Sequence, residues 1–66
     1  MRLKELRNRK CLTQNEIAIS IGVSQNTVSQ WENGDRLPRV DKLLLLAEIL
    51  ECSIDDLLDD VTQSDQ

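Results

Sequence analysis

Residues 14–33 read QNEIAISIGVSQNTVSQWEN, and this stretch decides the fold because its apolar residues recur at helical spacing. In its first half, Ile17, Ala18 and Ile21 fall on one face of a helix, since residues three and four apart share a side. Gly22 ends this helix because glycine readily adopts the left-handed conformation found at helix C-termini. The pattern therefore predicts an amphipathic helix over residues 14–21 that ends in a glycine turn.

A second helix is predicted over residues 25–32, directly after the turn. Ser24 carries a hydroxyl that suits the free N–H groups at its start. Val28 and Trp31 point back at the first helix. Trp31 is the single aromatic residue of the sequence, and we expect it to fill the core rather than to stack on a ligand. The outward face carries uncharged amides and a hydroxyl: Gln25, Asn26, Ser29 and Gln30.

Outside this pair, the hydrophobic pattern predicts three further helices, so the chain is expected to be all-α with five helices. The first covers residues 2–9, the fourth starts at or just after Pro38 and runs to about residue 50, and a short fifth follows Ser53. Thr13 and Glu16 form a capping box, in which each residue satisfies a backbone donor of the other. This box opens the second helix.

The fourth helix is apolar on more than one face. Its core face is expected to hold Val40, Leu43, Leu44, Ala47 and Leu50. Leu45 and Ile49 lie away from that stripe at about 100° per residue. A monomer of this size can hardly bury two sides of one helix, so we expect Leu45, Ile49 and Val61 to form a dimer interface with a second copy.

Length and charge bound the class of protein. The 66 residues, 39% apolar, make one small domain, expected over residues 1–58 and followed by a polar, acidic tail over residues 59–66. The net charge is -4 but is divided unevenly: residues 1–39 carry a net +3 and residues 40–66 a net -7. The basic half would turn toward a polyanion, although acidic residues also simply keep a small domain soluble.

Several kinds of site have no support in the composition. With two cysteines and no histidine, neither a zinc site nor a disulfide framework can be assembled. There is no nucleophile with a partner base and no phosphate-binding glycine loop, so we expect neither an enzyme nor a cofactor. The longest apolar run, residues 43–47, is too short to cross a bilayer, and we expect a cytoplasmic protein with no metal or membrane partner.

The segment Thr13–Gly34 resembles the helix-turn-helix of the Cro and phage-repressor (XRE-like) family of DNA-binding domains. The matching features are Gln14 at the opening, Ala18 at the helix crossing, Gly22 in the turn and the ending Trp31-Glu32-Asn33-Gly34. Residues 38–58 look like the last two helices of that family. The resemblance implies a compact, lambda-repressor-like domain, often dimeric, that binds a palindromic operator in double-stranded DNA and regulates transcription. We expect this chain to act as a repressor.

The amide-bearing face gains a role from this resemblance and from its own chemistry. The family positions that reach base edges in the major groove hold Gln25, Asn26 and Gln30, and Ser29 adds a hydroxyl. Glutamine or asparagine bonds adenine at N6 and N7 together, which is worth about 1–3 kcal/mol of discrimination. The alternative is a merely solvated face, but helix exteriors usually carry Glu, Lys and Arg.

Six further residues are expected to contact the DNA backbone: Arg7, Gln14, Thr27, Asn33, Arg36 and Arg39. The resemblance also pairs Arg7 with Glu32 in a largely buried ion pair, from which part of the guanidinium can still face a phosphate. For Asn33, a left-handed helix cap is nearly as good an interpretation. The two arginines after the third helix are otherwise ordinary surface cations.

The sequence leaves two functions open. One is a two-fold symmetric, sequence-specific DNA-binding regulator. The other is an antitoxin-like or co-regulatory interaction module with the same fold, which binds a protein partner through its acidic last helices and for which DNA binding is secondary. Replacing Gln25, Asn26 and Gln30 by alanine separates the two, because operator selection is lost only under the first.

Overall fold

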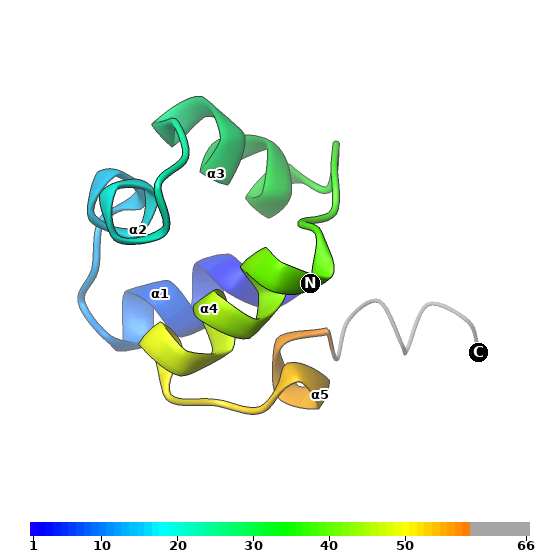
Figure 1. The fold of residues 1–66 in the computed structure, drawn as a ribbon. Coiled ribbons are helices and arrows are strands. Elements are labelled where there is room, and N and C mark those ends of the chain that lie inside the picture. Colours follow the sequence, from blue (N-terminus) through cyan, green and yellow to red (C-terminus); the bar gives the residue numbers. More distant parts are fainter. Residues whose placement is uncertain (59–66) are drawn as a thin grey trace.

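The structure is a computed structural model that describes residues 1–58, and these residues form five helices without a strand. The helices are α1 (Leu3–Arg9), α2 (Gln14–Ile21), α3 (Gln25–Asn33), α4 (Val40–Leu50) and α5 (Ile54–Leu57). α2 packs against α3 and α4, α3 also packs against α1, and α5 packs against α4. Figure 1 shows α3 and α5 at opposite ends of the molecule. The all-α prediction with five helices is confirmed.

Local capping explains where α2 and α3 begin and end. The Glu16 N–H donates to the Thr13 hydroxyl at 3.0 Å and the Thr13 N–H donates to the Glu16 carboxylate at 2.8 Å, which completes the predicted capping box. Ser24 caps α3 by accepting a backbone N–H at 3.1 Å. Gly22 and Gly34 follow the two helices with φ of 86° and 83°, the left-handed conformation that glycine tolerates best.

One hydrophobic core joins all five helices. Its buried members are Leu3, Leu6, Ile17, Ala18, Ile21, Val28, Trp31, Leu46, Leu50 and Leu57. Trp31 is only 5% exposed, so its predicted role as a core residue is confirmed. A backbone bond of 2.8 Å from the Arg2 N–H to the Leu57 carbonyl also ties the N-terminus to α5. The core thus holds the back of α3 while the front stays open.

The core face of α4 differs from the prediction. Val40 and Leu44, expected inside, are 71% and 58% exposed, and those two assignments were wrong. Leu46, which was not expected inside, is fully buried and joins Ala47 and Leu50 in the core. Because this helix has five consecutive apolar residues, its sequence fits several inward faces equally well. The neighbouring helices decide which face is buried.

Four large apolar side chains on α4 and on the arm before it stay exposed, and they are called here the outer apolar stripe: Leu37, Val40, Leu44 and Leu45. Leu37 is 62% exposed and Leu45 is 39% exposed. Ile49, expected at a dimer interface beside Leu45, is half-buried and packs against the core. Val61, the third residue of that expected interface, lies outside the described residues. No helix of the described part is long and apolar enough to cross a membrane.

Candidate nucleic-acid interface

α3 carries a polar outer face on a rigid back. Val28 and Trp31 are buried behind it, at 0% and 5% exposure. In Figure 1 the helix lies along the edge of the molecule. The four residues expected to contact bases all lie on α3, with Gln25 and Asn26 exposed and Ser29 and Gln30 half-buried. The structure therefore brings the predicted base-contacting residues onto one helix.

A shallow hollow of about 350 Å³ opens between the start of α2 and α3. It is lined by Gln14, Gln25, Asn26 and Ser29. These side chains are uncharged amides and a hydroxyl, which both donate and accept hydrogen bonds. The hollow therefore combines three of the expected base-contacting residues with one expected backbone-contacting residue.

Behind the hollow, Arg7 and Glu32 form a nearly buried ion pair between α1 and α3. The Arg7 Nε–H donates to Glu32 Oε2 at 2.6 Å, and Nη2 donates to Oε1 at 3.4 Å. Arg7 Nη1 also donates to the Leu12 carbonyl at 2.7 Å. The side chains are 11% and 3% exposed, so the predicted pair is present and mainly structural. The guanidinium retains N–H groups beyond those three bonds.

The same carboxylate extends a hydrogen-bond chain to the front of the molecule. Gln14 Nε2 donates to Glu32 Oε1 at 2.9 Å, and Gln25 Nε2 donates to Gln14 Oε1 at 3.4 Å. Sequence reasoning missed both bonds, because they depend on how α2 crosses α3 and no spacing in the sequence signals them. Gln14 is thus joined both to the ion pair and to the first residue of α3.

Two of the expected backbone-contacting residues lie at the ends of α3. The Thr27 hydroxyl is 2.8 Å from the Ser24 hydroxyl, so it belongs to the N-terminal cap. Asn33 is the last residue of α3 and is exposed, while Gly34 takes the left-handed position after it. The alternative role of Asn33 as a left-handed cap was therefore wrong.

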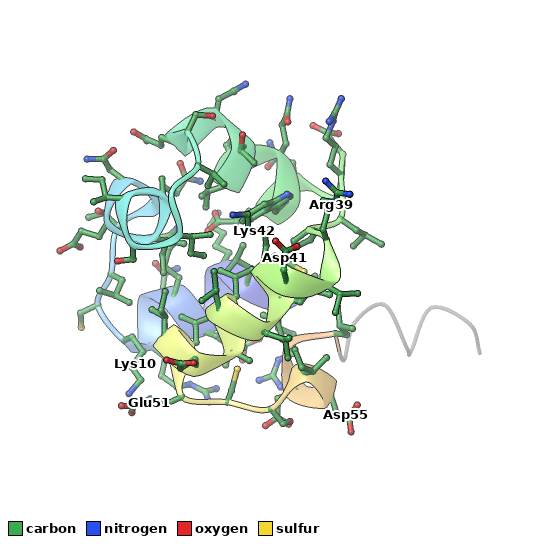
Figure 2. The ribbon with its side chains drawn as sticks, viewed as in Figure 1. Lys10, Arg39, Asp41, Lys42, Glu51 and Asp55 are labelled. Carbon is green, nitrogen blue, oxygen red and sulfur yellow. The ribbon has the colours of Figure 1, made fainter. Side chains whose placement is uncertain are left out.

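Arg36 and Arg39 are both exposed and lie on the arm between α3 and α4. The Asp35 N–H donates to the Gln30 carbonyl at 2.9 Å, which ties the start of this arm to the end of α3. Figure 2 shows Arg39 at the N-terminal end of α4. Both arginines therefore follow the amide-bearing helix closely.

The basic half of the chain holds less available charge than the sequence suggests. Four of its cations are engaged in ion pairs: Arg2 and Arg9 with Glu5, Arg7 with Glu32, and Lys10 with Glu51. The bond from Lys10 lowers the pKa of the Glu51 carboxyl, and the bond from Arg2 lowers that of Glu5. Lys10 and Glu51 lie together at the end of the molecule away from α3 (Figure 2). Few cations are thus left to face a polyanion.

A second hollow, of about 360 Å³, lies between α1 and the turn from α4 to α5. Arg2, Lys10 and Cys52 are among its lining residues. Burial raises the pKa of the Cys52 thiol, so this cysteine is a poor nucleophile at neutral pH. Among residues 1–58, no group of three His, Cys, Asp or Glu side chains is arranged to hold a metal ion.

Comparison with known proteins identifies the family. A sequence model of a helix-turn-helix family matches residues 3–57, which are nearly all of the residues that the structure describes. The chain belongs to the helix-turn-helix family of Cro and phage-repressor type. Its five-helix arrangement is that of the lambda-repressor-like fold, as the resemblance implied.

Relatives of this helix-turn-helix domain are named as regulators of transcription. It is 35% identical over 57 residues to the HTH-type transcriptional activator BcrR of Enterococcus faecalis, covering 86% of this chain and 28% of the relative. It is 38% identical over 61 residues to the cryptic phage CTXphi transcriptional repressor RstR of Vibrio cholerae, covering 86% and 54%. Repressor protein C2 of Salmonella phage P22 is 35% identical over 57 residues, covering 86% and 26%.

The chain spans about half or less of the length of these curated relatives. The shared part is the helix-turn-helix domain, since the matched region of this chain is residues 3–57 in the family comparison. No solved structure matches the chain at a significant level.

Proposed function

We propose that this chain is the sequence-specific DNA-binding part of a transcriptional regulator, which reads double-stranded DNA with α3 in the major groove. The observation that carries the proposal is the uncharged amide face of α3. The opposite face of the same helix is held in the core by the buried side chains of Val28 and Trp31. Amides donate and accept at once, as the edges of bases require. The names of the relatives, two repressors and one activator, support the same function.

The proposal divides the interface into two sets of residues. Base edges are read by Gln25, Asn26, Ser29 and Gln30, which lie on α3. The backbone is contacted by Arg7, Gln14, Thr27, Asn33, Arg36 and Arg39. Because most other cations of the basic half are held in ion pairs, binding depends less on salt than is usual for a DNA-binding protein.

The regulator acts in the cytoplasm as a repressor, without a cofactor, a metal or an enzymatic activity of its own. Two of the relatives carry the word repressor in their names. The direction of regulation is tested with a reporter gene placed behind the selected operator. Expression should fall when this protein is supplied, and a rise would show activation instead.

Selection of bound duplexes from a random pool at near-physiological salt tests the DNA-binding function. The protein should enrich a palindromic sequence, and the Gln25→Ala, Asn26→Ala, Gln30→Ala triple variant should lose that selection while it keeps the helical content of the parent. These three positions are exposed or half-buried, so the fold does not depend on them. Enrichment of no sequence at all would overturn the proposal.

The active form in this proposal is a homodimer. The outer apolar stripe supports it, because Leu37, Val40 and Leu44 are each more than half exposed. Burying such aliphatic side chains against a second copy removes their apolar surface from water. The interface expected from the sequence, Leu45, Ile49 and Val61, is thereby extended to Val40 and Leu44 on α4 and to Leu37 on the arm before it. A two-fold dimer would place two copies of α3 in successive major grooves about 34 Å apart.

Sedimentation velocity with matched variants tests the dimer. Leu44→Lys places a charge in the outer apolar stripe and should shift the protein to monomer, with weaker binding to the full palindrome. Ile19→Lys is the control, because Ile19 is 72% exposed and lies on α2 rather than on the stripe. Equal sedimentation of the parent and both variants would contradict an interface at this stripe.

A further inference from the structure

The hydrogen-bond chain from Arg7 to Gln25 connects the interior of the domain to its reading face. Arg7 holds the Glu32 carboxylate at 2.6 Å, Glu32 accepts from Gln14 at 2.9 Å, and Gln14 accepts from Gln25 at 3.4 Å. Glu32 is the most firmly held member of this series of hydrogen bonds, because its side chain is only 3% exposed. A buried carboxylate paired with arginine cannot turn away without leaving both charges unpaired.

The chemistry of the carboxylate determines which way the Gln14 amide faces. An ionised carboxylate only accepts hydrogen bonds, so Gln14 must present its NH2 group, and not its oxygen, to Glu32. The Gln14 oxygen is then directed toward Gln25. An oxygen also only accepts, so Gln25 must present an N–H to it. The orientation imposed by Glu32 is thus passed through two amides.

This orientation limits what Gln25 can read. With one N–H used on Gln14, the Gln25 amide still has its oxygen and its second N–H, which form an acceptor beside a donor. Adenine offers the complementary pair in the major groove, a donor at N6 and an acceptor at N7. Guanine offers two acceptors there and leaves the glutamine oxygen without a partner.

We infer that Glu32 is a positioning residue for base selection: through Gln14 it orients the Gln25 amide so that α3 selects adenine at the base that Gln25 reaches. The inference rests on the proposed DNA-binding function and adds to it the source of one base preference. Arg7 takes part indirectly, since it holds the carboxylate in place. Glu32 itself stays behind the surface and reads no base.

The first test keeps the ion pair of Arg7 and Glu32 intact and removes the hydrogen bonds of the Gln14 side chain. Duplex selection with the parent and with Gln25→Ala identifies the base position that Gln25 reads, which should be adenine. The variant Gln14→Met keeps the length of the side chain but removes its amide, and it should lower the adenine preference at that position by about tenfold. Gln30→Ala serves as the control, because it should change a different position only.

The second test addresses Glu32. In the double variant Arg7→Met, Glu32→Gln, both charges are removed together, which avoids an unpaired buried charge. Glutamine at position 32 can either donate or accept, so the Gln14 amide loses its fixed direction. The adenine preference should fall as it does in Gln14→Met. In the free protein, the side-chain amide proton signals of Gln14 should also move upfield in NMR spectra.

The outcomes separate the inference from the proposed function. If Gln14→Met and the double variant weaken all duplexes evenly and keep the adenine preference, Glu32 is only structural and the inference is wrong. If the double variant does not fold, an adenine preference that stays unchanged in Gln14→Met still overturns the inference. If the parent enriches no sequence, the proposed function fails and the inference fails with it, whereas a parent that selects guanine at the Gln25 position overturns the inference alone.

Discussion

The helix-turn-helix, α2 and α3, differs from α4 in how its position is determined. α2 and α3 each start at a side-chain cap, Thr13 and Ser24, and each is followed by a left-handed glycine. α4 is preceded by Arg39, an N-cap residue without a side-chain cap bond, and is followed by Glu51, a non-glycine residue at φ 55°. Local signals therefore define α2 and α3, whereas tertiary packing must hold α4 in place.

The two regions also differ in their surfaces. The front of α3 is polar and its apolar residues are buried, so a single inward face accounts for all of them. α4 is apolar at five consecutive positions, and only part of that surface fits into the core. A clear periodicity thus defines both the core and the functional face of a helix, while a continuous apolar run defines neither.

The largest expected effect tests which face of α4 is buried. Leu46→Ala should lower the free energy of unfolding by about 2–5 kcal/mol, because Leu46 is fully buried and its loss leaves a cavity. Leu44→Ala, the matched control, should change it by less than about 0.5 kcal/mol at a concentration where the protein is monomeric. Urea unfolding measures both. Equal losses would show that the two faces of α4 are not as different as the structure indicates.

The helix ends provide the next comparison. Gly34→Ala should destabilise the protein by about 1–2 kcal/mol, since a side chain disfavours φ near 83° even though the added Cβ would meet no atom within 4 Å. Glu51→Gly should act in the opposite direction and stabilise by up to about 1 kcal/mol, because Glu51 has a positive φ. Thermal unfolding distinguishes them, and a loss of stability in Glu51→Gly would mean that the Lys10 ion pair outweighs backbone strain.

The residues that precede each helix provide a comparison with smaller expected effects. Thr13→Ala removes half of the capping box and should cost about 1 kcal/mol. Arg39→Ser adds a hydroxyl where α4 has no side-chain cap bond and should stabilise by about 0.5 kcal/mol or more. Under the proposed function, the same variant should bind DNA more weakly. Chemical denaturation and binding assays report the two effects separately, and an unchanged stability would argue against the Arg39 N-cap.

The smallest effect concerns pH. The hydrogen bond from Lys10 lowers the pKa of Glu51 from its ordinary value of 4.5. A carboxyl with a lowered folded-state pKa adds stability above its unfolded pKa, and this contribution disappears as the pH falls through the folded value. Lys10→Met should return the pKa of Glu51 toward 4.5, as measured by NMR titration. The stability difference between parent and variant should shrink as the pH falls below 4.5, and a constant difference would exclude this linkage.

Much of the fold was predictable because its signals are local. The Thr13 and Ser24 caps, the Gly22 turn and the burial of Trp31 follow from residue type and spacing, and the structure agrees with each. The candidate base-contacting residues were equally predictable from the sequence, since they occupy the face opposite the buried stripe of one helix. Their contacts with DNA remain predictions.

The errors on α4 and the missed hydrogen bond from Gln14 have one physical cause. Val40 and Leu44 were placed inside and Leu46 was not, because an apolar run gives no period from which to choose a face. The bond from Gln14 to Glu32 joins residues 18 positions apart in different helices, so no local pattern indicates it. Both features depend on distances between helices that only the packed core establishes.

Local interactions along the sequence define the five helices, the ends of α2 and α3, and the amide face of α3, because backbone capping and amphipathic spacing act within a few residues. Packing between the helices sets which side of α4 enters the core and how the buried Glu32 carboxylate reaches Gln14. Side chains must fill the interior closely, and buried charges must find partners, so these choices depend on all the helices together.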